Sequence, residues 1–365
     1  MSRVSLVLGL LCMLVLWQPA RALPRYAAQY AQSCHLCHVN PAGGGLRSAF
    51  GSQFFAGTEL SSHPLGLDQL KELSTTLGDR VELGLDFRGM ALLESQSGSP
   101  ETSLPRHKQG TFFLMQGDLN LGLRLHEKVQ VILQQSLLGS GEVYGLLGVL
   151  PWHGSLKVGR FLPFYGWHWV DHQTASRQAL GFQPGQMDTG VEAELHPDHW
   201  SLALGATNDN AGMLDANPGK ALTGRACWQG QGLGGSLSLG SSARLSDRAP
   251  QSSRVMTGLL VGYARGPCTW TLQADRFESG DVAGVALTQE VAWRLKPGLD
   301  LLYGHDFTDP DLDRRTGLDQ RHRLGVDWIP LPCLALQPAL SLQTHQEYGR
   351  SDDWLLGEVQ LYLFM

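Results

Sequence analysis

Apolar and polar residues alternate along most of the chain, from residue 81 to the C-terminus. In residues 81–87, Val, Leu, Leu and Phe alternate with Glu, Gly and Asp, and residues 119–126 and 358–363 repeat this period of two. Such alternation predicts β-strands that have one apolar and one polar face. No helical period is visible in this part of the sequence, so we expect it to be all-β.

Sixteen segments of this kind can be placed, and their connections alternate in length. Short connections at 126–128, 196–199, 296–298 and 330–332 contrast with long polar ones at 95–110, 165–186, 208–219, 242–252 and 307–318. The 138–141 connection is short where a long loop is expected. Short turns at one end and long loops at the other are typical of outer-membrane β-barrels. The segments begin near Val81, Thr111, Lys128, Val143, Leu156, Met187, Trp200, Ala221, Leu233, Val255, Thr269, Ala283, Leu299, His322, Leu334 and Trp354.

The polar face of these segments separates a membrane barrel from a soluble β-sandwich. A sandwich also alternates, but its apolar face points inward and its polar face points to solvent. Here the polar positions carry acids, amides and arginines on strand after strand, which suits a wet lumen inside an apolar, lipid-facing wall. We therefore predict an antiparallel outer-membrane barrel of about 16 strands over residues 79–365. Residues 161–169 open its longest loop, which either folds inward as a constriction or caps the outside.

The first 22 residues have the pattern of a secretory signal peptide. Arg3 precedes an apolar stretch over residues 4–17, and Ala20-Arg21-Ala22 fits a cleavage site. A transmembrane anchor is the alternative, but the apolar stretch is short for one. We expect residues 1–22 to be removed and the protein to reach the bacterial outer membrane.

Composition narrows the classes of partner. The chain is 17% charged with a net charge of −6, and its 42% hydrophobic content suits fine alternation with polar residues. An acidic balance argues against nucleic-acid binding, which needs basic surfaces. It favours cationic partners or metal ions instead, with outer-membrane lipid around the barrel.

Residues 34–38 read Cys-His-Leu-Cys-His, the spacing of a c-type haem attachment site. Cys34 and Cys37 would bond the haem covalently, and His38 would be the proximal ligand of its iron. A thioredoxin-like dithiol would need a βαβ context, and a zinc site would need a second Cys/His pair; the sequence offers neither. We expect residues 23–78 to form a small α-helical segment that carries one haem c. Because so short a segment makes a small core, we expect it to plug the barrel lumen.

The second axial ligand of the iron has two candidates. His63 lies in the N-terminal segment, just before Pro64, and Met90 has the lumen-facing parity of the first strand. Met115 has the lipid-facing parity of the second strand and is not expected to reach the iron. An iron without a sixth protein ligand is a further alternative. A Met ligand would raise the reduction potential relative to a His ligand.

The remaining cysteines outside the signal peptide are Cys227, Cys268 and Cys333. Three is an odd number, so they cannot form a complete set of disulfides, and no spacing selects a pair or a role.

A single haem motif followed by about sixteen strands resembles the outer-membrane monohaem cytochrome–porin fusion family, which includes the fused cytochrome-porins of iron-oxidising bacteria. Cys34, Cys37 and His38 carry this resemblance. The stretches NPAGGGLRSAFG and GRFLPFYG are similar to those of relatives but have no assigned chemistry. The resemblance implies electron transfer between an extracellular donor or acceptor and periplasmic electron carriers. With Fe(II) as the donor, it would imply extracellular iron oxidation.

Two other functions agree with the same sequence. The chain could be a solute-transport porin whose haem segment lies in the periplasm as a redox carrier or gate, or a barrel in which the haem is only structural.

Overall fold

The computed structural model describes residues 24–66, 68–97, 108–139, 141–169, 171–183, 185–210, 215, 218–247, 253–314, 316–348 and 350–365. The expected signal peptide, residues 1–22, lies outside these ranges, and its removal stays a prediction.

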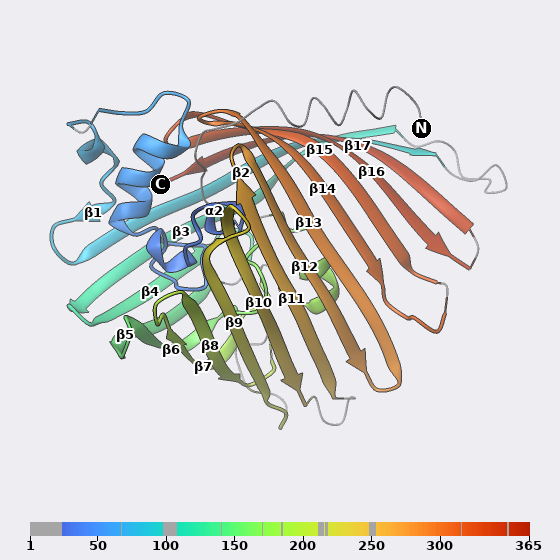
Figure 1. Ribbon diagram of the computed structural model, residues 1–365, viewed down its shortest axis with the longest axis horizontal. Coiled ribbons are helices and arrows are strands. Elements are labelled where there is room, and N and C mark those ends of the chain that lie inside the picture. The colour runs from blue at the N-terminus through green and yellow to red at the C-terminus, as the bar shows by residue number, and fades with distance from the viewer. Residues whose placement is uncertain are drawn as a thin grey trace.

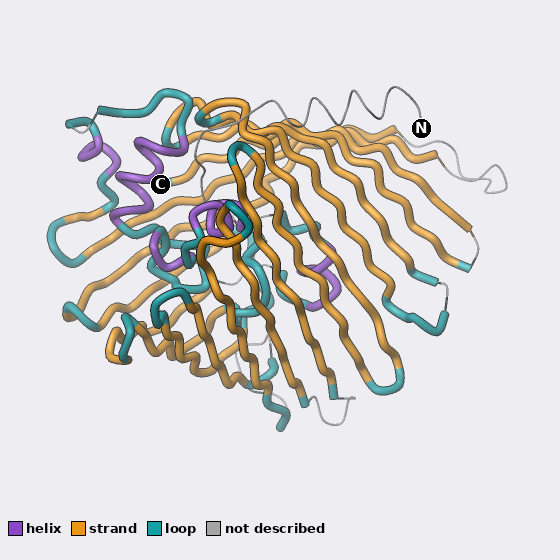
Figure 2. Tube along the Cα trace, in the orientation of Figure 1, coloured by secondary structure: helices purple, strands orange, loops and turns teal. Residues whose placement is uncertain are grey.

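Sixteen antiparallel strands form a closed barrel (Figures 1 and 2). Each strand from β2 onward pairs with the next along the chain, and β17 closes the barrel on β2. A short β1 (Thr76–Leu77) adds to the start of β2. The predicted barrel and all sixteen of its strands are confirmed. The strands are β2 (Val81–Ser97), β3 (Lys108–His126), β4 (Val129–Ser136), β5 (Glu142–Leu150), β6 (Gly154–Phe161), β7 (Asp188–Leu195), β8 (Trp200–Thr207), β9 (Ala221–Gly232), β10 (Gly235–Ser246), β11 (Arg254–Arg265), β12 (Cys268–Ser279), β13 (Val282–Lys296), β14 (Leu299–Asp309), β15 (Leu318–Leu331), β16 (Leu334–Glu347) and β17 (Arg350–Phe364).

The helices are short and belong to the N-terminal segment and one loop. They are α2 (Pro24–Tyr30), η1 (Cys34–Leu36), η2 (Phe50–Leu60), η3 (Leu70–Leu73) and α3 (Ala175–Leu180). The N-terminal segment was expected to be α-helical, but among its described elements only α2 is an α-helix; η1 and η3 are 3-10 turns and η2 is a π-helix. In the ranges described, no helix has the length and apolar character to span a membrane.

The outer and inner faces of the wall differ as the alternation predicts. In β11, Val255 and Leu259 are exposed on the outer face, whereas Met256 and Leu260 are buried on the inner face. Exposed aliphatic side chains continue around the barrel. A closed sheet with an apolar outer band is stable in lipid, where all backbone groups are paired within the sheet. Members of this band include Leu83, Leu85, Leu119, Leu204, Leu222, Leu239, Leu301, Leu340 and Val359.

The N-terminal segment enters the lumen, as predicted for a plug (Figure 1). Helix α2 packs against β10, β11 and β12. It approaches the wall closely at Gly262, where an added Cβ would lie only 2.7 Å from Ala28 Cβ. Arg25 of α2 is 2% exposed and forms ion pairs with Glu290 of β13, at 3.2 Å, and with Asp327 of β15. These bonds fix α2 to the inner wall.

A second arginine of the N-terminal segment binds β2 and β17, the two strands whose pairing closes the barrel. Arg47 Nη2 lies 3.2 Å from Asp86 Oδ1 on β2 and 2.9 Å from Tyr362 Oη on β17. Its Nη1 donates to the Met365 carbonyl at 3.3 Å. The guanidinium also lies 4.9 Å from the ring centre of Phe364. One side chain of the plug therefore contacts both the first and the last strand of the barrel.

A cluster of buried charges joins β6 and β7 on the inner face of the barrel wall. Lys157 Nζ of β6 lies 2.7 Å from Glu192 Oε1 and 3.2 Å from Glu194 Oε1 of β7, and all three side chains are at most 1% exposed.

Replacing Lys157 with alanine leaves two buried carboxylates without their cation. We expect a loss of about 3–5 kcal/mol in the free energy of unfolding, measured by urea titration in detergent. The exposed turn variant Lys128→Ala should change it by less than about 0.5 kcal/mol. Equal stability of the two variants would show that the cluster is solvated.

Candidate functional site

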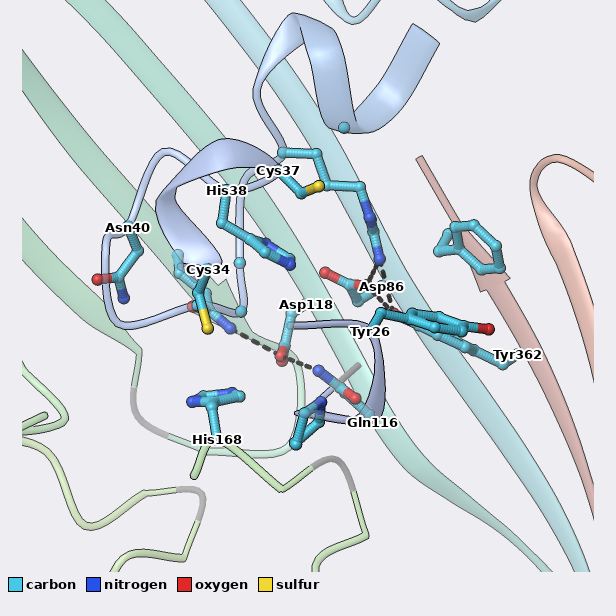
Figure 3. A pocket seen from close by; sticks show the side chains of 18 of the residues that line it. Tyr26, Cys34, Cys37, His38, Asn40, Asp86, Gln116, Asp118, His168 and Tyr362 are labelled. Atoms are coloured by element: carbon cyan, nitrogen blue, oxygen red, sulfur yellow. Dashed lines mark hydrogen bonds and ion pairs between the residues drawn. The ribbon is translucent and has the colours of Figure 1, made fainter. Parts of the chain in front are cut away.

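The Cys34–His38 motif forms a single tight turn. The Cys37 and His38 amides both donate to the Cys34 carbonyl, at 3.1 and 3.0 Å. This turn, η1, brings the three side chains of the motif to one cavity (Figure 3). Cys34 and Cys37 are both free thiols, so neither is committed to a disulfide.

The cavity measures about 930 Å³, near the upper end of the usual size of small-molecule sites. Four parts of the chain line it: the N-terminal segment, strands β2 to β5, the long loop between β6 and β7, and strands β15 to β17. The lining includes Cys34, Cys37, His38, Phe50, Phe54, Arg47, Arg88, Gln116, Asp118, His168, His172 and Arg177.

The long loop, residues 162–187, folds into the lumen and does not cap the outside. The Trp167 amide and the Trp169 indole both donate to Gln273 Oε1 of β12, at 2.8 and 3.0 Å. The Gly166 amide donates to Ser242 Oγ of β10 at 3.0 Å. His168 therefore lies between two tryptophans that are both hydrogen-bonded to Gln273 of β12.

Burial affects the protonation of His38 and His168, two of the three histidines that line the cavity. It lowers the pKa of His38 to about 4, and the nearby Arg47 guanidinium lowers it further. It lowers the pKa of His168 to about 3, with Arg177 and His38 adding to the effect. Both rings are therefore neutral near pH 7, which leaves each with a nitrogen lone pair that can bind a metal.

Burial also raises the pKa of both thiols of the motif. The pKa of Cys34 rises, and that of Cys37 rises to about 12, because burial and the neighbouring Cys34 both disfavour the thiolate. A redox dithiol needs a lowered pKa, so this environment does not favour that chemistry.

The residues present fit a covalently attached haem. Two thiols and a neutral imidazole share the cavity, and the arginines Arg47, Arg88 and Arg177 supply positive charge that suits the haem propionates. The Nδ1 atom of His38 is buried and has no hydrogen bond of normal geometry within the described ranges, although Gly44 and Gly45 pass close to the ring.

Glycines shape the wall beside the motif. Gly43, Gly44 and Gly45 have φ of +89°, +77° and +58°, a conformation that other residues adopt at a cost in energy. A Cβ at Gly44 would lie 2.7 Å from His168 Nε2. The run therefore lets the backbone pass directly against His168.

We predict that Gly44→Ala strains this loop and displaces His168. We expect a loss of more than about 1 kcal/mol in stability and a lower ratio of haem to protein, measured by thermal unfolding and by a haem assay. The control is Gly78→Ala, because Gly78 also has a positive φ of +62° but no atom within 4 Å of the added Cβ. If both variants bind haem alike, the contact with His168 has no role in the site.

The structure does not bring His63 or Met90 to this cavity. His63 is exposed at the barrel mouth, where its Nδ1 lies 3.0 Å from the Pro330 carbonyl, so it holds the plug against the end of β15. Met90 faces the lumen as predicted, but it lines a smaller neighbouring cavity of about 80 Å³. Neither residue lies among those that line the large cavity.

The prediction that Met115 faces lipid is wrong. Arg88 pairs with Gln116, but Gly89 pairs with Leu114, so Met115 is the extra residue of a β-bulge. A bulge inserts one residue and shifts the alternation of faces. Met115 consequently lines both cavities.

Comparison with known proteins supports the barrel. No protein-family model and no curated protein matches the sequence. The structure is similar to OprB of Pseudomonas putida at high pH, with a TM-score of 0.62, 10% identity and coverage of 85% of this chain and 100% of that one. It is also similar to an anion-selective porin from Comamonas acidovorans (TM-score 0.54, 12% identity, 78% and 99% coverage). OmpT of Vibrio cholerae matches with a TM-score of 0.53, 9% identity, and 80% and 100% coverage.

These similarities establish a porin-like barrel fold. Together with the apolar outer face, this fold identifies a barrel of the bacterial outer membrane. The comparisons do not support the finer resemblance to cytochrome–porin fusions, because the matched proteins are porins. Attachment of haem at Cys34 and Cys37, with His38 as a ligand, is therefore a proposal that rests on the motif and its cavity.

Proposed function

We propose that this porin-like barrel holds one covalently attached haem c in its lumen and exchanges electrons between an extracellular donor or acceptor and periplasmic carriers. One observation carries the proposal: Cys34, Cys37 and His38 all line a cavity enclosed by the barrel wall, the plug and the long loop. When bound, haem supplies a one-electron iron couple. Cys34 and Cys37 would hold it by thioether bonds, and His38 would bind the iron.

The position of the cavity suits exchange between the two faces of the membrane. The apolar band of such barrels is about 25 Å tall, so a group at one mouth is far from a partner at the other. A group in the lumen is nearer to both. The reduced partner on one face loses one electron and the oxidised partner on the other gains it, without transfer of atoms. Extracellular Fe(II), oxidised to Fe(III), is one donor of this kind.

A second candidate is a solute-transport porin in which the haem segment acts as a redox carrier or gate. The comparisons favour this candidate over electron transfer, because the matched structures are porins. The occupied lumen favours the first, because α2 and the 162–187 loop lie where a solute would pass. Transport would require at least one of these segments to move.

Intact cells that produce the protein provide the test. Membrane-impermeant reductants and oxidants, added outside, should change the absorbance of the haem, and cells with the Cys34→Ser/Cys37→Ser variant should show no such change. A native protein that carries haem but does not respond would refute electron exchange with the outside. Uptake of small sugars by liposomes that contain the protein would then support the porin candidate.

A further inference from the structure

We propose that His168, on the loop between β6 and β7, is the second axial ligand of the haem iron, opposite His38. The inference rests on the proposed function, since it requires a haem at Cys34 and Cys37. It deepens that proposal by naming a residue from the opposite side of the cavity.

The two histidines reach one cavity from different segments. His38 comes from the N-terminal plug and His168 from the long loop, and both line the space beside Cys34 (Figure 3). His168 also lies against the backbone that follows His38: an added Cβ at Gly43 would meet His168 Cβ at 3.7 Å, and one at Gly44 would meet its Nε2 at 2.7 Å. The ring is therefore next to the attachment turn.

The loop holds His168 in a defined place. Its neighbours Trp167 and Trp169 are both bonded to Gln273. Further along the loop, Asp171 Oδ2 lies 2.7 Å from Arg321 Nη2 of β15. A ligand fixed by bonds on both sides is preorganised for an iron atom, because little freedom is lost when it binds.

Three other side chains that line the cavity could compete: His172, Met115 and Met187. His172 shares the loop, and burial lowers its pKa to about 3, so it is also neutral. The difference between the two histidines is in their contacts: His168, and not His172, supplies the atoms nearest to an added Cβ at Gly44. These contacts, which place His168 beside the attachment turn, favour His168.

Two histidine ligands have a measurable consequence. A Met ligand raises the reduction potential of a c-type haem, so two imidazoles give a lower potential than a His–Met pair. The iron would also connect the plug to the long loop, which enter the lumen as separate segments. Both effects depend on His168 and not on the barrel wall.

The test uses the full-length haem protein in detergent. We expect low-spin ferric spectra in absorbance and electron paramagnetic resonance, and the near-infrared magnetic circular dichroism of two imidazole ligands. His168→Ala should become high-spin and return to low-spin when imidazole is added. His168→Met should stay low-spin and have a higher potential. The matched control, His172→Ala, should keep the native spectra.

The outcomes separate this inference from the proposed function. A native chain without covalent haem would overturn both. A native chain with haem and a His–Met signature, or a low-spin His168→Ala variant, would overturn the assignment of His168 and leave the haem site in place. High-spin spectra of His172→Ala alone would assign the ligand to His172. Should His168→Ala fail to fold, the signature of the native chain still decides between imidazole and methionine.

Discussion

Replacing both Cys34 and Cys37 with serine is expected to abolish covalent haem attachment. Serine hydroxyls do not form the thioether bonds, while the change in side-chain volume is small, so the barrel should still fold. Haem staining of the exported protein after denaturing electrophoresis measures the result, and we expect the stain to disappear. The single replacements should each leave at most one bond and a weaker stain.

The control is Cys333→Ser, which replaces an exposed cysteine outside the motif. This variant should stain like the native protein. Heat-modified migration on gels would show that all variants contain a folded barrel. A stain that persists in the double variant would show that the motif is not the site, and the proposed function would lose its basis.

Removal of the plug is expected to have the second large effect. Deleting residues 24–75 from the full chain takes α2 and its ion pairs out of the lumen, and water should fill the space, as in open porins. We expect single-channel conductance in planar bilayers to rise several-fold above that of the native chain. The native chain itself should conduct poorly.

A milder variant provides the matched control for this deletion. Arg25→Gln removes the charge that binds Glu290 and Asp327 but keeps most of the side-chain volume. We expect brief openings of intermediate conductance, because the plug is loosened and not removed. If the native chain already conducts like the deletion variant, the lumen is open and the solute-transport candidate gains support.

The barrel could be predicted from the sequence because each strand carries its own signal, the alternation of apolar and polar residues. Lipid on one side and a polar lumen on the other impose the same alternation on each strand, so parity assigns the faces of residues such as Leu85 and Asp86 correctly. The face of Met115 was predicted wrongly because the bulge that contains it depends on pairing with β2. Cross-strand register is not encoded in the alternation of one strand.

Only part of the candidate site could be predicted from the sequence. Cys34, Cys37 and His38 are close in sequence and their spacing carries the chemistry. His168 lies far along the chain and reaches the cavity only because the long loop folds inward. One signal could have pointed to it: a histidine between two tryptophans, in a loop too long for a simple connection. His63 is closer to the motif in sequence, but in the fold it lies at the barrel mouth, against the Pro330 carbonyl.

The position of Arg47 has a consequence for biogenesis. Its partners are Asp86 on the first barrel strand and Tyr362 and Met365 at the end of the chain. The complete set of bonds can form only after β17 has paired with β2. Final docking of the N-terminal segment is therefore coupled to closure of the barrel, and a chain whose barrel has not closed lacks the complete set of Arg47 bonds.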